Sequence, residues 1–163
     1  MRERSSPPSP APPDSDLIAE VARRFRPDPG HALARVWDFT GTARGRPRHR
    51  LWLRRCWLGG ATEARAFAAA VETARLSRQP WALGSDLFVA VLPRLTPAFQ
   101  PLLRGPGPLA RLSHAVAVYD AGRRRVYAAG RTSRLPAFRP FLAAVGATRP
   151  GRVPAAGTPR PSA

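Results

Sequence analysis

Arginine is by far the most frequent ionisable residue in this chain, and its guanidinium group can bind anions. The 163 residues include 27 basic side chains against 10 acidic ones, which gives a formal net charge of +17, and every basic side chain is an arginine. GC-rich codons can explain the absence of lysine, but they do not explain the shortage of Asp and Glu. A guanidinium group binds phosphate in a bidentate manner and stacks on aromatic rings, which an ammonium group does not. We therefore expect the protein to capture a polyanion, because a charge excess of this size attracts polyanions and speeds their association.

The arginines concentrate in two clusters, each at a predicted β-hairpin. In the first cluster a period of two places Arg44 to Arg50 on one side of the chain if that segment is extended. Its members are Arg44, Arg46, Arg48, Arg50, Arg54 and Arg55. The second cluster starts at a hairpin tip and continues beyond it, with Arg139 following, and its members are Arg123, Arg124, Arg125, Arg131 and Arg134. A basic hairpin can grip a phosphate backbone, so we predict both clusters as nucleic-acid contacts; an exposed, solvated turn is the alternative.

Two tryptophans, Trp52 and Trp57, lie beside the first cluster. Aromatic rings next to cations suit base stacking or cation–π contact. The alternative is that both indole rings pack in the core, and we favour this alternative for the pair.

The sequence does not indicate a catalytic, metal or cofactor site. Zinc spacing and a local Cys–His signature are both absent around the single cysteine and the three histidines, which are Cys56, His31, His49 and His114. Gly59-Gly60 precedes a predicted helix and could bind an anion at its N-terminus, but no dinucleotide or Walker pattern surrounds it. We therefore expect no enzyme activity, no cofactor and no metal.

Hydrophobic periodicity predicts elements in the order α-β-β-α-β-α-β-β-α, which is a single layered α+β domain. The predicted helices cover residues 16–25, 63–77, 97–103 and 136–145, and the predicted strands cover 33–39, 49–58, 87–92, 114–119 and 125–129. Asp16 and Thr62 are expected to cap the first and second helices. Asp120-Ala121-Gly122 is expected to form the turn of the clearest hairpin.

The two ends of the chain differ in composition from the body between residues 15 and 147. Residues 1–14 and 148–163 are rich in proline and carry few apolar side chains, so we expect disordered arms. No apolar run approaches 18 residues, which argues against a transmembrane segment, and the first residues lack the apolar region of a signal peptide. With a single cysteine, these features favour an intracellular location, in the cytoplasm or in the nucleus of a eukaryotic cell.

Two functions of different classes fit these observations. The first is a non-enzymatic, arginine-rich protein that binds nucleic acid, either RNA or nonspecific duplex, through its two basic hairpins. The second is a structural or interaction protein, such as an accessory protein of a GC-rich virus or bacterium, that docks an acidic protein partner. Both use the same positive surface, so sequence alone does not separate them.

Overall fold

A six-stranded mixed sheet organises the chain. The computed structural model describes residues 14–28, 35–78, 84–104, 114–146 and 151. The elements are α1 (Asp14–Arg24), β1 (Phe25–Pro27), β2 (Phe39–Ala43), β3 (Arg46–Arg55), α2 (Ala61–Leu76), β4 (Ser85–Leu92), η1 (Gln100–Leu103), β5 (His114–Asp120), β6 (Arg125–Ala128), η2 (Gly130–Arg134) and α3 (Phe138–Ala144), where η denotes a 3-10 helix.

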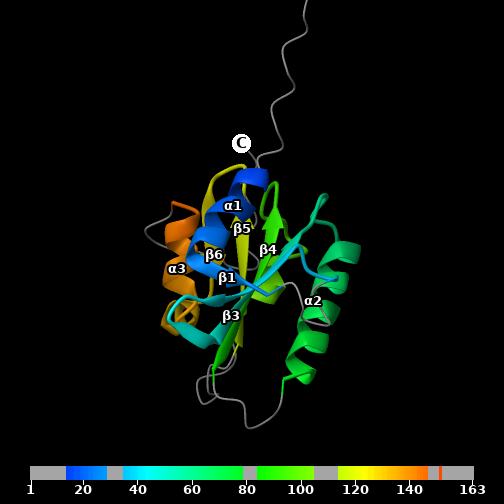
Figure 1. Ribbon diagram of the computed structural model, residues 1–163. Helices are drawn as coiled ribbons and strands as arrows, with labels where there is room; N and C mark the ends of the chain where they lie inside the picture. Colours follow the sequence, from blue (N-terminus) through cyan, green and yellow to red (C-terminus); the bar gives the residue numbers. More distant parts are fainter. Residues whose placement is uncertain (1–13, 29–34, 79–83, 105–113, 147–150, 152–163) are drawn as a thin grey trace, which may run out of the picture.

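The strands lie in sequence order, β1 to β6, across the sheet. The three central strands, β3, β4 and β5, are parallel to one another, and the outer pairs β1–β2, β2–β3 and β5–β6 are antiparallel. Helices α1 and α3 cover one face of the sheet, and α2 covers the other (Figure 1). The predicted α+β class and single layered domain are confirmed.

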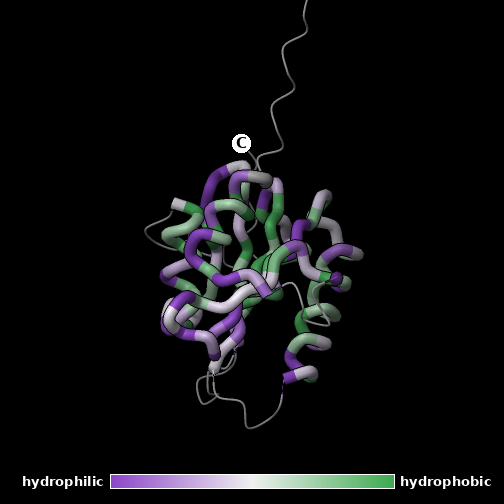
Figure 2. The backbone as a smooth tube through the Cα atoms, in the orientation of Figure 1, coloured by the Kyte–Doolittle hydropathy of each residue, from purple (hydrophilic) through white to green (hydrophobic). Residues whose placement is uncertain are grey.

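Each face of the sheet buries its own apolar cluster. On the face covered by α1 and α3, Val21, Phe25 and Phe141 pack against the odd-numbered residues of β3 and β4. On the face covered by α2, Phe67 packs with the two buried indoles of Trp37 and Trp52. The central strands therefore bury side chains on both faces, as the hydrophobic stretch at their centre indicates (Figure 2).

The N-terminal half of the sheet differs from the prediction. The strand predicted at 33–39 lies instead at Phe39–Ala43, since residues 35–38 form a turn and bend; residues 33 and 34 lie outside the described residues. Strand β1 was not predicted, because three residues carry almost no periodic signal and the strand exists by pairing with β2. The predicted caps are also displaced, because α1 begins at Asp14 and α2 is capped by Gly60 without a side-chain hydrogen bond.

The two predicted arms fall almost wholly outside the described residues. Gly151 is the exception in the C-terminal arm: it forms a parallel bridge to Tyr127, and its N–H donates to the Val126 carbonyl at 2.5 Å. This residue therefore adds one pairing to the outer edge of β6.

A buried ion pair ties the end of α2 to the sheet. Asp86, only 5% exposed, accepts a hydrogen bond from Trp52 Nε1 at 3.1 Å and another from Arg78 Nη1 at 2.7 Å. Arg78 Nη2 also donates to the Arg48 carbonyl at 3.0 Å, so one guanidinium group joins α2, β3 and β4. Removing the arginine would leave a buried carboxylate without its counter-charge, which is costly.

We predict that Arg78→Met destabilises the protein by about 3 kcal/mol. The matched control is Arg75→Met: Arg75 pairs with Glu72 three residues away, where the two side chains are 43% and 56% exposed. An exposed pair of this kind contributes less than about 1 kcal/mol. Urea unfolding of both variants is the measurement, and equal losses would show that the buried pair does not hold α2 to the sheet.

Candidate nucleic-acid interface

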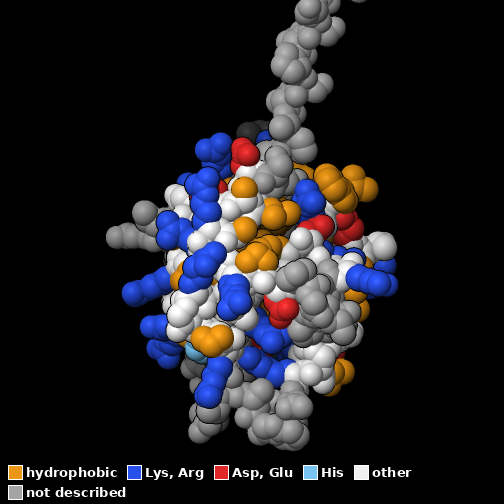
Figure 3. All heavy atoms as spheres, viewed as in Figure 1, with side chains coloured by type: hydrophobic (Ala, Val, Ile, Leu, Met, Phe, Trp, Pro, Cys, Tyr) orange, Lys and Arg blue, Asp and Glu red, His pale blue; other side chains and the backbone are white. Residues whose placement is uncertain are grey.

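Basic side chains cover much of the surface formed by α1, α3 and the lower end of the sheet (Figure 3). On this side of the molecule a pocket of about 700 Å³ opens between the β2–β3 hairpin and the segment from η2 to α3. Its lining residues are Ala43, Arg44, Arg46, Ser133, Arg134, Leu135, Pro136, Arg139 and Pro140. We call it the arginine pocket. It brings two arginines of the first predicted cluster together with Arg134 of the second and with Arg139.

Arg46 reaches the arginine pocket because the β2–β3 pairing shifts register. Thr42 pairs with Arg50, but the next residue of β2, Ala43, pairs with Arg46. Ala43 belongs to the core beneath α1 and α3, and directly paired residues share a face. Arg46 therefore lies on the α1/α3 face, whereas Arg50 lies on the same face as Trp52, toward α2. The prediction that Arg44 to Arg50 share one side was wrong, because a β-bulge interrupts the alternation.

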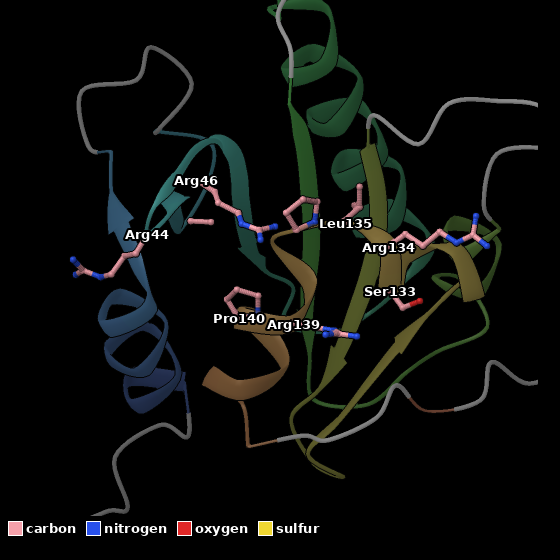
Figure 4. A pocket seen from close by; sticks show the side chains of 9 residues that line it. Arg44, Arg46, Ser133, Arg134, Leu135, Arg139 and Pro140 are labelled. Carbon is pink, nitrogen blue, oxygen red and sulfur yellow. The ribbon is translucent and has the colours of Figure 1, made fainter.

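The four arginines of the arginine pocket have different orientations (Figure 4). Arg46 extends from β3 toward Leu135, and Arg139 lies between Pro140 and Ser133. Arg44 and Arg134 point outward on opposite sides of the group. Arg44 is held there by hydrogen bonds from Nε to the Arg23 carbonyl at 3.0 Å and from Nη2 to the Ala22 carbonyl at 3.3 Å, which satisfy carbonyls at the end of α1.

In the described part of the chain, no carboxylate neutralises the arginine pocket. None of its nine lining residues is acidic, and among the described residues no ion pair joins Arg46, Arg134 or Arg139 to an acid. Leu135 forms part of the apolar base of the pocket. It is 3% exposed, and its N–H donates to the Thr132 carbonyl, so its position is fixed. Arg46 and Arg139 therefore lie at an apolar cavity, with Arg44 and Arg134 at its edges, and this group of guanidinium groups suits an anion.

Three other arginines of the second cluster lie at the opposite end of the sheet. Arg123, Arg124 and Arg125 are exposed at the β5–β6 turn, at the carboxyl ends of the parallel strands. The buried carboxylate of Asp120 fixes this turn by accepting the N–H groups of Arg123 at 2.8 Å and Leu95 at 3.0 Å. The two predicted basic hairpins are both present, but their tips lie at opposite ends of the sheet (Figure 1).

Arg48, Arg54 and Arg55 do not line the arginine pocket. Arg48 is exposed near the start of β3, and the backbone of Arg131 lies in η2. Arg54 and Arg55 lie at the end of β3, where Arg55 pairs with Asp38 at 3.7 Å between Nε and Oδ1. The guanidinium group of Arg55 also lies over the Trp57 ring, 5.7 Å from its centroid.

The two tryptophans have different environments. Trp52 is 3% exposed, as the core interpretation predicted, but Trp57 is 65% exposed, so that interpretation was wrong for Trp57. The loop that joins β3 to α2, residues 56–60, carries Trp57 outward.

Cys56 does not form a catalytic pair with His49 or His114, because the residues lie far apart and the Cys56 thiol is only weakly acidic. His49 and Cys56 are seven residues apart along an extended strand, a separation of roughly 20 Å. His114 begins β5, at the end of the sheet opposite to Cys56. Burial, reinforced by the nearby Glu63 carboxylate, raises the pKa of the Cys56 thiol to about 12, so a nucleophilic thiolate does not form near neutral pH.

The N-terminus of α2 does not offer an anion site to a ligand, because the protein fills it with Glu63. The Glu63 carboxylate accepts the N–H groups of Trp57, Leu58 and Gly59 at 2.6, 2.7 and 2.7 Å. These backbone hydrogen bonds lower the pKa of Glu63 against the opposing effect of burial. The position corresponds to the third residue of a capped helix, where a glutamate commonly reaches back to backbone donors.

No protein-family model, no curated protein and no solved structure significantly matches this chain. Within the described residues, no group of three or more His, Cys, Asp and Glu side chains is placed to hold a metal ion. No helix in the described part of the chain combines the length and apolarity needed to cross a membrane. Function must therefore be inferred from the arginine pocket and its surroundings.

The pKa of His49 is sensitive to the charge of Arg46, which lines the arginine pocket. Its Nδ1 lies 2.9 Å from Ser85 Oγ. Burial lowers the pKa of His49 below 6.5, and the positive charges of Arg46 and Arg78 lower it further, while Asp86 opposes them. We predict that Arg46→Ala raises this pKa toward its ordinary value, because a repelling charge is removed, and that Arg65→Ala on α2 leaves it unchanged. NMR titration of the His49 imidazole measures the pKa in both variants. An unshifted pKa in Arg46→Ala would contradict the position of Arg46 near His49.

Proposed function

We propose that this protein is a non-enzymatic nucleic-acid-binding protein whose main phosphate contact is the arginine pocket. The observation that carries the proposal is that Arg46, Arg134 and Arg139, from three different elements, line one cavity without an acidic partner among the described residues. Like charges held together in this way repel one another, and a bound polyanion relieves that repulsion. Guanidinium groups also provide the bidentate geometry that phosphate oxygens accept.

A polymer fits this arrangement better than a small anion. Arg44 and Arg134 point outward on opposite sides of the arginine pocket, so the positive surface continues beyond the cavity in two directions (Figure 4). A phosphodiester backbone that crosses the cavity would meet a guanidinium group on each side. The net charge of +17 would also attract such a chain at long range.

Contacts of this kind give little sequence specificity. Phosphate contacts position a nucleic acid but do not read its bases. We therefore infer binding to RNA or to nonspecific duplex, in an intracellular setting. The scarcity of carboxylates and the unreactive thiol of Cys56 support a role without catalysis.

The alternative partner is an acidic protein, which the same charges would attract. Carboxylates on a folded partner are spread over a surface, whereas the arginine pocket concentrates several guanidinium groups in one cavity. That concentration suits a closely spaced phosphate backbone. Competition with polyglutamate separates the two partners: nucleic acid should resist displacement by polyglutamate of equal charge.

We predict that the triple variant Arg46→Ala, Arg134→Ala, Arg139→Ala weakens binding to a labelled RNA at least tenfold at one salt concentration. The matched control is Arg65→Ala, Arg75→Ala, Arg104→Ala, whose exposed positions belong to α2 and the end of η1, on the other face of the sheet. Both variants lower the formal net charge from +17 to +14. The pocket variant should also reduce the steepness of the log–log salt dependence by roughly 2 to 3, since about three phosphate contacts are lost.

Equal losses from the two triple variants would show that only total charge matters, and the arginine pocket would then not be the binding site. Binding by the wild-type protein that is insensitive to salt would overturn the polyanion proposal itself.

A further inference from the structure

The β3–α2 loop holds an exposed aromatic ring on a rigid support. Trp57 is 65% exposed and its neighbour Leu58 is 87% exposed, the two most hydrophobic features of the local surface. Figure 3 shows exposed hydrophobic side chains over this end of β3, near the start of α2. An exposed apolar patch rimmed by polar side chains is typical of an interaction site.

The backbone under Trp57 is fixed on several sides. Glu63 accepts three consecutive N–H groups of the loop, beginning with that of Trp57. Thr96 Oγ1 donates to the Gly59 carbonyl at 2.6 Å, and the N–H of Cys56 donates to the Val91 carbonyl at 2.9 Å. Gly59 adopts a φ of +68°, and a Cβ there would meet the Thr96 methyl group at 2.7 Å, so this turn specifically accommodates glycine. The loop therefore presents Trp57 in one place instead of letting it fold back onto the core.

The Trp57 ring lies in positively charged surroundings. The Arg55 guanidinium group lies over it at 5.7 Å from the centroid, which orients the indole and adds positive charge beside it. The same end of the sheet carries the exposed Arg123, Arg124 and Arg125, and the side chain of Arg94 lies beside their turn, 3.8 Å from where a Cβ on Gly122 would stand. The nearest acids are already engaged: Asp38 pairs with Arg55 and Glu63 holds the loop.

We propose that Trp57 is a stacking platform for an unpaired nucleobase, with the surrounding arginines contacting the adjoining phosphates. This inference rests on the proposed nucleic-acid-binding function and deepens it, because it selects single-stranded segments over fully paired duplex. Every base offers a π-face to an aromatic ring, so the contact is tolerant of sequence, whereas the bases of a duplex are already stacked on one another. A protein partner is disfavoured, because two apolar side chains among arginines are far smaller than the surface that a specific protein interface buries.

The platform and the arginine pocket lie at opposite ends of β3, whose 10 residues span roughly 30 Å. A single strand that reaches both would cover several nucleotides, within the roughly 4–16 nucleotides of known single-strand sites. The two contacts would then act as linked sites on one ligand.

The experiment compares three labelled ligands at one salt concentration: a 12-nucleotide single strand, its perfect duplex, and an abasic phosphodiester strand of equal length. Trp57→Ala should weaken binding of the single strand about 5- to 150-fold, the range expected for losing one stacked base, and should change binding of the other two less than twofold. Trp57→Phe should restore part of the loss. Leu58→Ala, which removes the neighbouring exposed side chain, should leave all three affinities unchanged.

Equal losses on the single strand and the abasic strand, or no loss on either, would overturn the stacking proposal. So would a loss matched by Leu58→Ala, which would indicate a general apolar contact. The triple variant of the arginine pocket is measured in parallel on the abasic strand, which has no bases to stack. A failure of that variant to weaken binding contradicts the proposed function, whereas the Trp57 contrast between ligands decides the stacking proposal separately.

Discussion

Acidic side chains are scarce in this protein, and the fold uses them to satisfy donors within its own structure. Asp86 balances Arg78 beneath α2, and the fully buried Asp120 closes the β5–β6 turn. Glu63 takes three backbone N–H groups before α2, and Asp38 accepts the Arg55 N–H at 2.6 Å. Carboxylates committed in this way are not available to neutralise the arginine pocket. The surface around the arginine pocket therefore stays positive, because the chain has few acids and the fold uses these four internally.

The topology of the sheet decides which arginines meet. Strand β6 runs antiparallel to β5, so the chain returns from the Arg123–Arg125 turn toward the opposite end of the sheet and places η2 and α3 beside the β2–β3 hairpin. The register shift at Ala43 then turns Arg46 toward them. Residues more than 80 positions apart in the sequence share one cavity as a result, while neighbours such as Arg46 and Arg50 lie on opposite faces.

Much of the fold follows from local patterns. The β5–β6 hairpin, the alanine-rich α2 and the apolar β4 carry strong signals and occur where they were predicted. Strand β1 and the position of β2 depend on pairing across the sheet, which a three-residue segment does not encode locally. Trp57 was expected in the core because a strand usually buries its aromatic residues. Glu63, three residues after the Gly59-Gly60 pair, was the available signal, because a glutamate there accepts the N–H groups of the loop before α2. The grouping of Arg46 with Arg139 had no sequence signal, since it requires the β-bulge.

If the guanidinium groups of Arg46, Arg134 and Arg139 act as one phosphate site, they should respond together to a bound nucleic acid. Side-chain NMR of arginine Nε–Hε groups during titration with a short RNA measures this response. The signals of Arg46, Arg134 and Arg139 should shift together along one binding curve, while that of Arg65 on α2 stays nearly constant. Shifts of similar size for all exposed arginines, or separate binding curves for the three, would contradict a single phosphate site.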